Sequence, residues 1–216
     1  MTGYDFSLSG ARLAALRSGA LYWPDQNLLC VSDLHLGKSE RQARRGGPTL
    51  PPYEVQDTLD RLAKDLQQTQ ATTVICLGDS FDDTAAASAL PQAHQHRITE
   101  LTSARRWIWI SGNHDPAPLD LPGDQHADVS ITPLTFRHIA QPDVTGEISG
   151  HYHPKARLRG TSRPAFLLDD KRLILPAYGT YTGGLRSSDP ALSTLMGPRA
   201  LAILTGPHPM PIPMPR

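Results

Sequence analysis

The sequence predicts an α/β fold in which two sheets pack face to face between helices, an α/β/β/α sandwich. In the first part of the chain, apolar runs of strand length alternate with helical segments. Short polar motifs follow those runs, which is typical of parallel strands whose loops meet at one sheet edge. Beyond residue 131 the runs shorten and are separated by Asp-Lys, Pro and Gly turns, so we expect a second, antiparallel sheet there.

The elements of the first sheet can be placed one by one from their patterns. Residues 11–23 read as a hairpin that turns at Arg17-Ser18-Gly19. The crossover segments carry apolar residues on one helical face, and Pro91 is a residue type that opens helices. The expected strands are 28–32, 72–77 and 107–110, and the expected helices are 53–68 and a segment after Pro91 that includes Ile98 and Leu101.

The second half is predicted as short strands followed by an irregular end. The strand candidates are 131–136, 156–158, 164–168 and 172–175. Residues 206–216 contain five prolines, and we expect them to form an irregular arm. Residues 1–205 are therefore expected to form a single domain, because 216 residues are enough for one substantial core.

The composition limits the classes of function. The 21 basic and 21 acidic residues balance, so anion binding must come from local clusters and not from the whole molecule. The two cysteines, Cys30 and Cys76, lie in apolar runs, and the start lacks a charged segment followed by an apolar one. We expect a reduced, cytoplasmic protein. No apolar run approaches about 18 residues, so no membrane span is expected.

Five polar stretches are the candidate site. They contain two carboxylates, one amide oxygen and four imidazoles, and no thiolate. This mixed oxygen and nitrogen set suits manganese, iron, zinc or a similar divalent ion. Its members are Asp33, His35, Asp79, Asn113, His138, His151 and His153, with Asp82 and His114 beside them.

The set fits a pair of ions. Asp33 and His35 alternate at a strand end, so they can face the same ion. Asp79 is the candidate bridge, since a carboxylate has two oxygens and paired ions lie about 3.5–4 Å apart. His151 and His153 could each serve one ion. Asn113 would then supply a neutral oxygen, and His114 would face the substrate.

His138 has the weakest context of these residues. Only Phe136 and Arg137 precede it as a local signal, and its place between the other motifs is its main qualification. We favour it as a ligand because an ion needs a filled coordination shell. His126 is the alternative.

The densest basic cluster lies just after the first motif. Its members are Lys38, Arg41, Arg44 and Arg45. Their closeness to Asp33 in sequence favours contact with substrate phosphate, whereas a solvated charged loop is the alternative. Lys155, Arg157 and Arg159 follow His153 in alternation and could extend the same groove.

The motifs in this order resemble the calcineurin-like metallophosphoesterases over residues 28–153. Three longer stretches resemble, more narrowly, the bacterial ligase-associated DNA damage response endonucleases, over about residues 10–190. The stretches are Ser32-Asp33-Leu34-His35-Leu36-Gly37-Lys38, Gly78-Asp79-Ser80-Phe81-Asp82-Asp83, and Leu175-Pro176-Ala177-Tyr178-Gly179 with Tyr181-Thr182-Gly183-Gly184-Leu185. One departure is Asp83, where many members of the wider family have arginine; Lys38 or Arg41 is the nearest substitute for that phosphate-binding cation.

The resemblance implies roles for the site residues. One ion would be held by Asp33, His35, Asp79 and His153, and the other by Asp79, Asn113, His138 and His151. A hydroxide bridging the ions would attack phosphorus. His114 would stabilise the transition state or protonate the leaving alkoxide, and Asp82 would orient His114. Manganese is favoured, with iron, zinc and nickel as alternatives.

We therefore expect a two-metal phosphodiesterase that acts on DNA or another nucleic acid. By resemblance, it would work beside repair proteins such as a ligase, a helicase or an exonuclease, and not at a membrane. One alternative is a small-molecule phosphodiesterase or pyrophosphatase acting on a nucleotide-type substrate. Another is a repair scaffold with a degenerate site, which an intact set of candidate ligands disfavours.

Overall fold

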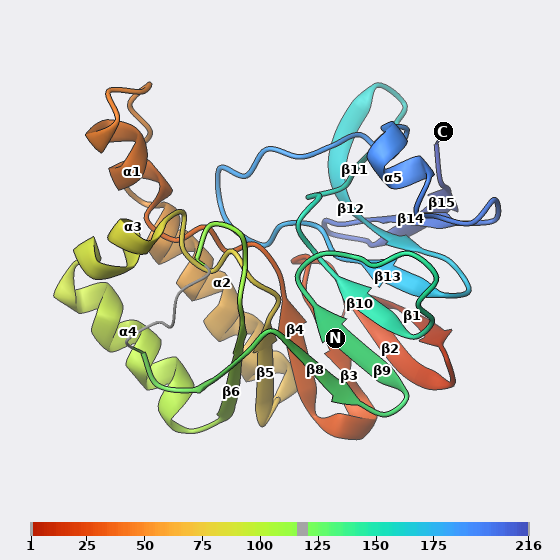
Figure 1. The fold of residues 1–216 in the computed structure, drawn as a ribbon, viewed down its shortest axis with the longest axis horizontal. Coiled ribbons are helices and arrows are strands. Elements are labelled where there is room, and N and C mark those ends of the chain that lie inside the picture. Colours follow the sequence, from red (N-terminus) through yellow and green to blue (C-terminus); the bar gives the residue numbers. More distant parts are fainter. Residues whose placement is uncertain (1, 116–120, 216) are drawn as a thin grey trace.

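The computed structural model describes residues 2–115 and 121–215 and contains two stacked sheets with helices to their sides (Figure 1). The first sheet has the strand order β1-β2-β3-β4-β5-β6-β7. Its strands are Gly3–Leu8 (β1), Ala11–Leu16 (β2), Leu21–Trp23 (β3), Leu28–Val31 (β4), Thr73–Cys76 (β5), Arg106–Ile110 (β6) and Asp124–His126 (β7).

Parallel pairing in the first sheet positions the site. β4 pairs parallel with β5, β5 with β6, and β6 with β7, whereas β1 to β4 pair antiparallel. The crossovers are made by α2 (Glu54–Thr69) and α4 (Gln92–Ser103). α2 buries an apolar stripe that includes Val55, Leu59 and Leu62, because residues three and four apart share one helical face. The carboxyl ends of β4, β5 and β6 thus lie at one edge.

The second sheet is mixed. Its order is β15-β14-β12-β13-β10-β9-β8, and β11 pairs with β12 off this path. β10 pairs parallel with both β9 and β13, whereas the other pairs are antiparallel. Its strands are Asp128–Ile131 (β8), Leu134–Arg137 (β9), Glu147–Ser149 (β10), Lys155–Leu158 (β11), Thr161–Leu168 (β12), Arg172–Ile174 (β13), Leu201–Leu204 (β14) and Met210–Pro213 (β15).

Three apolar clusters hold these layers together. One lies between the first sheet and α2 and α4, and includes Leu59 and Trp109. The second fills the space between the two sheets, where Trp23 stacks on Phe136 with ring centroids 6.4 Å apart. The third lies on the outer face of the second sheet against Leu192 of α5 (Pro190–Ser193). The predicted α/β sandwich is confirmed, with short helical cover on the second sheet.

Several predicted elements need correction. The second sheet is not purely antiparallel, and the strand expected over 131–136 is divided by a turn at Pro133 into β8 and β9. The polar stretch after the first motif contains α1 (Lys38–Arg44), and the loop after Asp82 contains α3 (Thr84–Ala89). A short 3-10 turn, Pro24–Gln26, connects β3 and β4.

The proline-rich end is a strand, which corrects the expectation of an irregular arm. β15 pairs antiparallel with β14, so that Ile212 lies opposite Ala202. Prolines alternate with Met210 and Ile212. An edge strand tolerates this pattern, because the residues lacking an N–H can face away from the single partner strand. Within the described residues, no helix is long and apolar enough to cross a membrane.

Candidate metal centre

The predicted site residues converge where the parallel strands end. Asp33 and His35 follow β4, Asp79 follows β5, and Asn113 and His114 follow β6. The second sheet contributes from its own strand ends: His138 follows β9, and His151 and His153 follow β10. Both sheets therefore supply side chains to one cluster.

An unusual backbone conformation marks five of these residues. Their φ angles are positive, between 45° and 69°, and they are Asp33, His35, Asp79, His151 and His153. Residues other than glycine adopt this left-handed region uncommonly, although Asp and His do so more readily than most. Such conformations concentrate at functional sites, where the surrounding structure holds them in place.

Two glycines allow the loops to approach one another. A Cβ on Gly150 would lie 1.7 Å from Ser32 Oγ, and one on Gly112 would lie 2.2 Å from the Asp79 backbone nitrogen. Both distances are impossible for real atoms, so only glycine fits. The close contact brings the His151 N–H to Asp33, where it donates to Oδ2 at 3.0 Å.

One group of candidate metal-binding atoms comes from Asp33, His35 and His153. His153 Nε2 lies 3.2 Å from Asp33 Oδ1 and 3.3 Å from His35 Nε2. Asp33 is fully buried. Their candidate ligand atoms all lie within 4.8 Å of one another, which is close enough for one ion to contact all three.

A second group is centred on His138. Its Nε2 lies 2.9 Å from Asn113 Oδ1, 3.2 Å from His151 Nδ1 and 3.5 Å from Asp79 Oδ2. The same Asp79 oxygen lies 3.9 Å from His35 Nε2 in the first group. Its other oxygen, Oδ1, accepts the His114 N–H at 2.9 Å. Asp79 Oδ2 therefore faces both groups.

The hydrogen bonds of His138 fix which atom faces the cluster. His138 Nδ1 contacts the Leu77 carbonyl oxygen at 2.7 Å, and a carbonyl only accepts, so the N–H is on Nδ1. In the neutral form of His138, Nε2 then presents a lone pair to Asn113, His151 and Asp79. A cation placed among these atoms would offset the repulsion between their lone pairs, and metal-binding histidines typically donate their second N–H to a carbonyl or carboxylate.

The charges of the cluster agree with this chemistry. Burial raises the pKa of Asp79, but His138, the His114 N–H and His35 outweigh burial and lower it to about 2. Burial lowers the pKa of His138, yet the neighbouring Asp79 and Asp33 raise it above its usual value. The cluster thus keeps its carboxylates ionised and attracts positive charge. Divalent cations fit its oxygen and nitrogen atoms.

Asp82 contacts a different partner from the one expected. Its buried carboxylate lies 3.0 Å from His35 Nδ1. His114 Nδ1 instead contacts the Asp82 backbone carbonyl at 2.8 Å, and the His114 ring meets the His35 ring edge to face at 5.0 Å. The expected contact between the Asp82 carboxylate and His114 is therefore made by the backbone oxygen, while the carboxylate lies beside His35.

The basic cluster of α1 is largely compensated by acidic side chains. Arg41 donates to Asp82 at 2.7 Å, and Lys38 lies 3.7 Å from the same carboxylate. Arg44 and Arg45 lie 3.0 Å and 3.6 Å from Asp83. Lys38 and Arg41 thus lie beside the candidate metal ligands, through Asp82. Arg44 and Arg45 instead lie against Asp83.

The two histidines that competed for one ligand position lie in different places. His138 is buried at the centre of the second group, 4% exposed. His126 is exposed at the end of β7, where its carbonyl oxygen accepts the Ser111 N–H.

Asp115 is a supporting residue that the sequence reasoning did not single out. Its buried carboxylate accepts four backbone N–H groups, from Asp79 (3.0 Å), Ser80 (2.7 Å), Phe81 (3.1 Å) and Gly112 (3.2 Å). It joins the loop after β5 to the loop after β6. Its position directly after Asn113-His114 was the signal available in the sequence.

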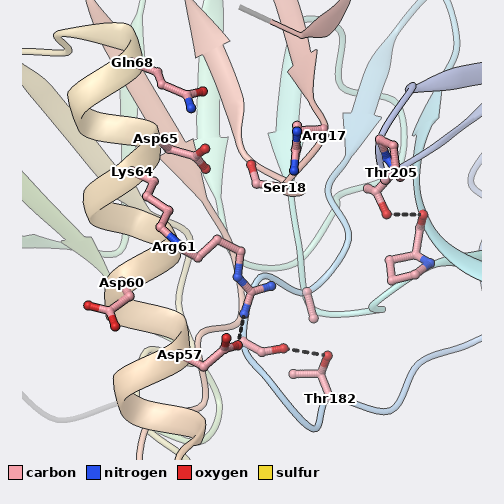
Figure 2. Close-up of a pocket in the computed structure, with 15 residues that line it drawn as sticks. Arg17, Ser18, Asp57, Asp60, Arg61, Lys64, Asp65, Gln68, Thr182 and Thr205 are labelled. Carbon is pink, nitrogen blue, oxygen red and sulfur yellow. Dashed lines mark hydrogen bonds and ion pairs between the residues drawn. The ribbon is translucent and has the colours of Figure 1, made fainter.

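The loop after β13 supports the Asp33 turn from behind. The Tyr178 and Gly179 N–H groups donate to the Ser32 and Asp33 carbonyl oxygens at 2.8 Å and 3.1 Å. The Tyr178 hydroxyl donates to Asp65 of α2 at 2.8 Å. The outer side of this loop borders a polar hollow of about 590 Å³ beside α2 (Figure 2).

Comparison with known proteins finds a family profile and solved structures to which this chain is similar. The sequence profile of the calcineurin-like phosphoesterase family matches residues 27–176. The crystal structure of Pseudomonas putida nuclease MPE superimposes with a TM-score of 0.77 at 28% identity, covering 97% of this chain and 100% of that one. A phosphoesterase from E. coli, Yfce, gives a TM-score of 0.39 at 14% identity, covering 87% of this chain and 99% of that one. No curated protein sequence matches.

Proposed function

The chain belongs to the calcineurin-like phosphoesterase family and is a metal-dependent phosphoesterase, and we propose that it is a dinuclear phosphodiesterase that cleaves DNA. The observation that carries the two-metal proposal is the position of Asp79 Oδ2, 3.5 Å from His138 Nε2 and 3.9 Å from His35 Nε2. One carboxylate oxygen between two clusters of lone pairs is the arrangement a bridging ligand needs.

In this proposal two groups of residues hold the ions. Asp33, His35 and His153 would hold one ion, and Asn113, His138 and His151 the other, with Asp79 shared. Two bound divalent cations supply a nucleophile by lowering the pKa of water, and they neutralise charge on the phosphoryl oxygens. Manganese is the ion we propose, because mixed carboxylate, amide and imidazole ligands suit it.

The protein's own groups would bind and protonate the substrate. His114 lies beside His35 without belonging to either ligand group of the proposal, and its Nδ1 contacts the Asp82 carbonyl. That contact leaves Nε2 to face a phosphoryl oxygen or the leaving alkoxide. Lys38 and Arg41 lie beside the buried Asp82 and are proposed to contact the scissile phosphate, in place of an arginine at Asp83.

Nucleic acid is the proposed substrate because the neighbour that matches along nearly the whole chain is named a nuclease. The family resemblance further suggests work beside DNA-repair proteins in the cytoplasm. A small-molecule phosphodiesterase or pyrophosphatase is the second candidate; the exposure of Asn113 at the rim of the cluster leaves room for either substrate. A degenerate scaffold is disfavoured by the complete set of ligand atoms.

A chromogenic assay tests the proposal. Hydrolysis of bis-p-nitrophenyl phosphate with Mn²⁺ is expected for the wild type. His114→Ala should retain bound metal but lose roughly 10²- to 10⁴-fold in kcat, the usual contribution of a proton donor. Asp79→Ala should lose metal and activity together. Full activity in either variant would refute the assigned site, and nicking of plasmid DNA by the wild type separates a nuclease from a small-molecule enzyme.

A further inference from the structure

A cationic pocket lies on the second sheet, away from α1. It has a volume of about 420 Å³ and is formed by the β11–β12 hairpin, the segment before α5 and the end of the chain. Its lining residues are Lys155, Arg157, Gly160, Ser162, Arg186, Ser187, Ser188 and Pro215. In Figure 1 the hairpin rises near α5, on the opposite side of the molecule from α1.

Strand geometry directs the three cations into this pocket. Lys155 and Arg157 are two residues apart on β11, so their side chains lie on one face, and Ala156 between them is buried on the other. Arg186 forms a β-bridge opposite Lys155. Ser162 lies opposite Arg157 in the hairpin. The positive side chains and a hydroxyl group thus share one surface.

In the part of the chain that the structure describes, no carboxylate compensates these charges. Within residues 2–115 and 121–215, none of the three cations forms an ion pair with an acidic side chain. Lys155 Nζ donates to the Thr182 carbonyl at 3.3 Å, and Arg157 Nε donates to the Gly160 carbonyl at 3.0 Å. Asp189, the nearby acid in sequence, instead caps α5 by accepting the Ala191 N–H at 2.9 Å.

The other polar hollow has a different character. The hollow in Figure 2 contains Arg61 and Lys64 but also Asp57 and Asp65 on the same helix. Arg61 and Asp57 form an ion pair at 3.1 Å. Its charges are therefore balanced, whereas acidic side chains are missing from the described lining of the cationic pocket.

We infer that the cationic pocket binds the phosphate backbone of the nucleic-acid strand being cleaved, beside the scissile position. Three cations with serine hydroxyl groups match phosphate oxygens, which accept hydrogen bonds and carry negative charge. Because the net charge of the chain is zero, a polyanion must be attracted by a local cluster of uncompensated cations such as this one. The inference rests on the proposed nuclease function and assigns part of its substrate groove.

The chain connects this pocket directly to the metal centre. Lys155 is two residues after His153, so their Cα atoms are at most about 7 Å apart. The Cα atoms of His153 and Arg157 are at most about 14 Å apart. A strand whose phosphate lies at the metal centre could therefore place the next few phosphates on Lys155, Arg157 and Arg186. Bis-p-nitrophenyl phosphate has a single phosphate and therefore lacks the further phosphates that would contact Lys155, Arg157 and Arg186.

The test compares binding of a polyanion with hydrolysis of the short diester. Arg157→Gln combined with Arg186→Gln should weaken binding of single-stranded oligothymidylate by about 25-fold at 0.1 M salt, because each lost phosphate contact contributes about fivefold there. The slope of log affinity against log salt should fall by about 1.4. Binding is measured by fluorescence anisotropy with Mn²⁺ in the His114→Ala background, so that the oligonucleotide stays intact.

A matched control removes two charges elsewhere. Arg12→Gln with Arg97→Gln changes the net charge equally at exposed positions on β2 and α4, and should leave oligonucleotide binding unchanged. Unchanged binding and salt slope in the Arg157, Arg186 variant would overturn the inference. The same two substitutions are also made in the protein that keeps His114. A loss of bis-p-nitrophenyl phosphate hydrolysis there that matches the loss of oligonucleotide binding would indicate a structural role and would also overturn the inference.

The failure of the underlying function gives a different result. A wild-type protein that hydrolyses bis-p-nitrophenyl phosphate but neither binds nor cuts the oligonucleotide would refute the nuclease proposal, and the pocket's role with it. A protein that cuts DNA with equal KM in the wild type and the pocket variant would refute only the pocket.

Discussion

Asp115→Asn is expected to destabilise the protein through the loops that form the metal centre. Each Asp115 oxygen accepts two backbone N–H groups: Oδ1 from Asp79 and Gly112, and Oδ2 from Ser80 and Phe81. An asparagine side chain keeps one acceptor oxygen and replaces the other with an NH₂ donor. Whichever way it is oriented, two N–H groups lose their acceptor and face another donor.

The size of the effect follows from this count. A buried donor left without a partner costs about 1–3 kcal/mol, so two should cost roughly 2–6 kcal/mol. The side chain is only 4% exposed, so water cannot readily replace the lost acceptor. The substitution hardly changes volume, which excludes a cavity as the cause.

Urea unfolding in EDTA measures this loss without a contribution from bound metal. Asp128→Asn is the matched control, because Asp128 is exposed on β8, and a surface change of this kind alters stability by less than about 0.5 kcal/mol. The reasoning would be wrong if Asp115→Asn lost less than about 1 kcal/mol. A loss equal to that of Asp128→Asn would show that the four N–H groups find other acceptors.

Three further predictions follow from the described contacts. In metal-free protein, the pKa of Asp79 is lowered to about 2 from an ordinary 3.8. This shift contributes stability that is present above pH 3.8 and is lost as the pH falls towards 2. In acid unfolding, the unfolding free energy of Asp79→Asn should therefore fall by roughly 2 kcal/mol less than that of the wild type over this range. Tyr178→Phe removes the hydroxyl donor from buried Asp65 and should cost about 1–2 kcal/mol in urea unfolding at pH 7, with less loss at acidic pH, where Asp65 takes up a proton. Arg44→Gln with Arg45→Gln should raise the KM for oligonucleotide by less than about threefold, because both guanidinium groups lie against Asp83 and so offer little uncompensated charge to a polyanion. A tenfold increase would show that these two cations contact substrate.

The strands that the sequence predicted well are those with a continuous apolar run. β4 and, after its exposed first residue Arg106, β6 are buried on both faces. Their runs are therefore continuously apolar and can be recognised without knowing their partners. The helix α2 was equally clear because its buried stripe repeats at helical spacing. These elements determine the sheet edge, which is why the meeting of the site motifs at that edge could be predicted.

Other elements depend on contacts that a local pattern does not contain. β10 begins with Glu147, which is buried because Arg172 and Arg137 lie 3.2 Å and 3.6 Å from its carboxylate. A charged residue at this position reads as a loop until its partners are known. The sequence of α1 resembled a solvated loop because one of its stabilising contacts comes from a distant residue. The Glu54 carboxylate accepts hydrogen bonds from both the N–H and the hydroxyl group of Ser39.

The placement of charge has the same physical limit and decides where nucleic acid would bind. A run of basic residues in sequence favours α1, but the fold places Asp82 and Asp83 against that helix, so much of its field is cancelled. The cations at 155, 157 and 186 are dispersed in sequence, yet a hairpin and a β-bridge bring them together, and no described residue pairs a carboxylate with them. Binding of a polyanion responds to uncompensated charge rather than to the number of basic residues. The cationic pocket on the second sheet is therefore the stronger candidate for holding the nucleic-acid strand. In this proposal α1 acts only on the scissile phosphate, through Lys38 and Arg41.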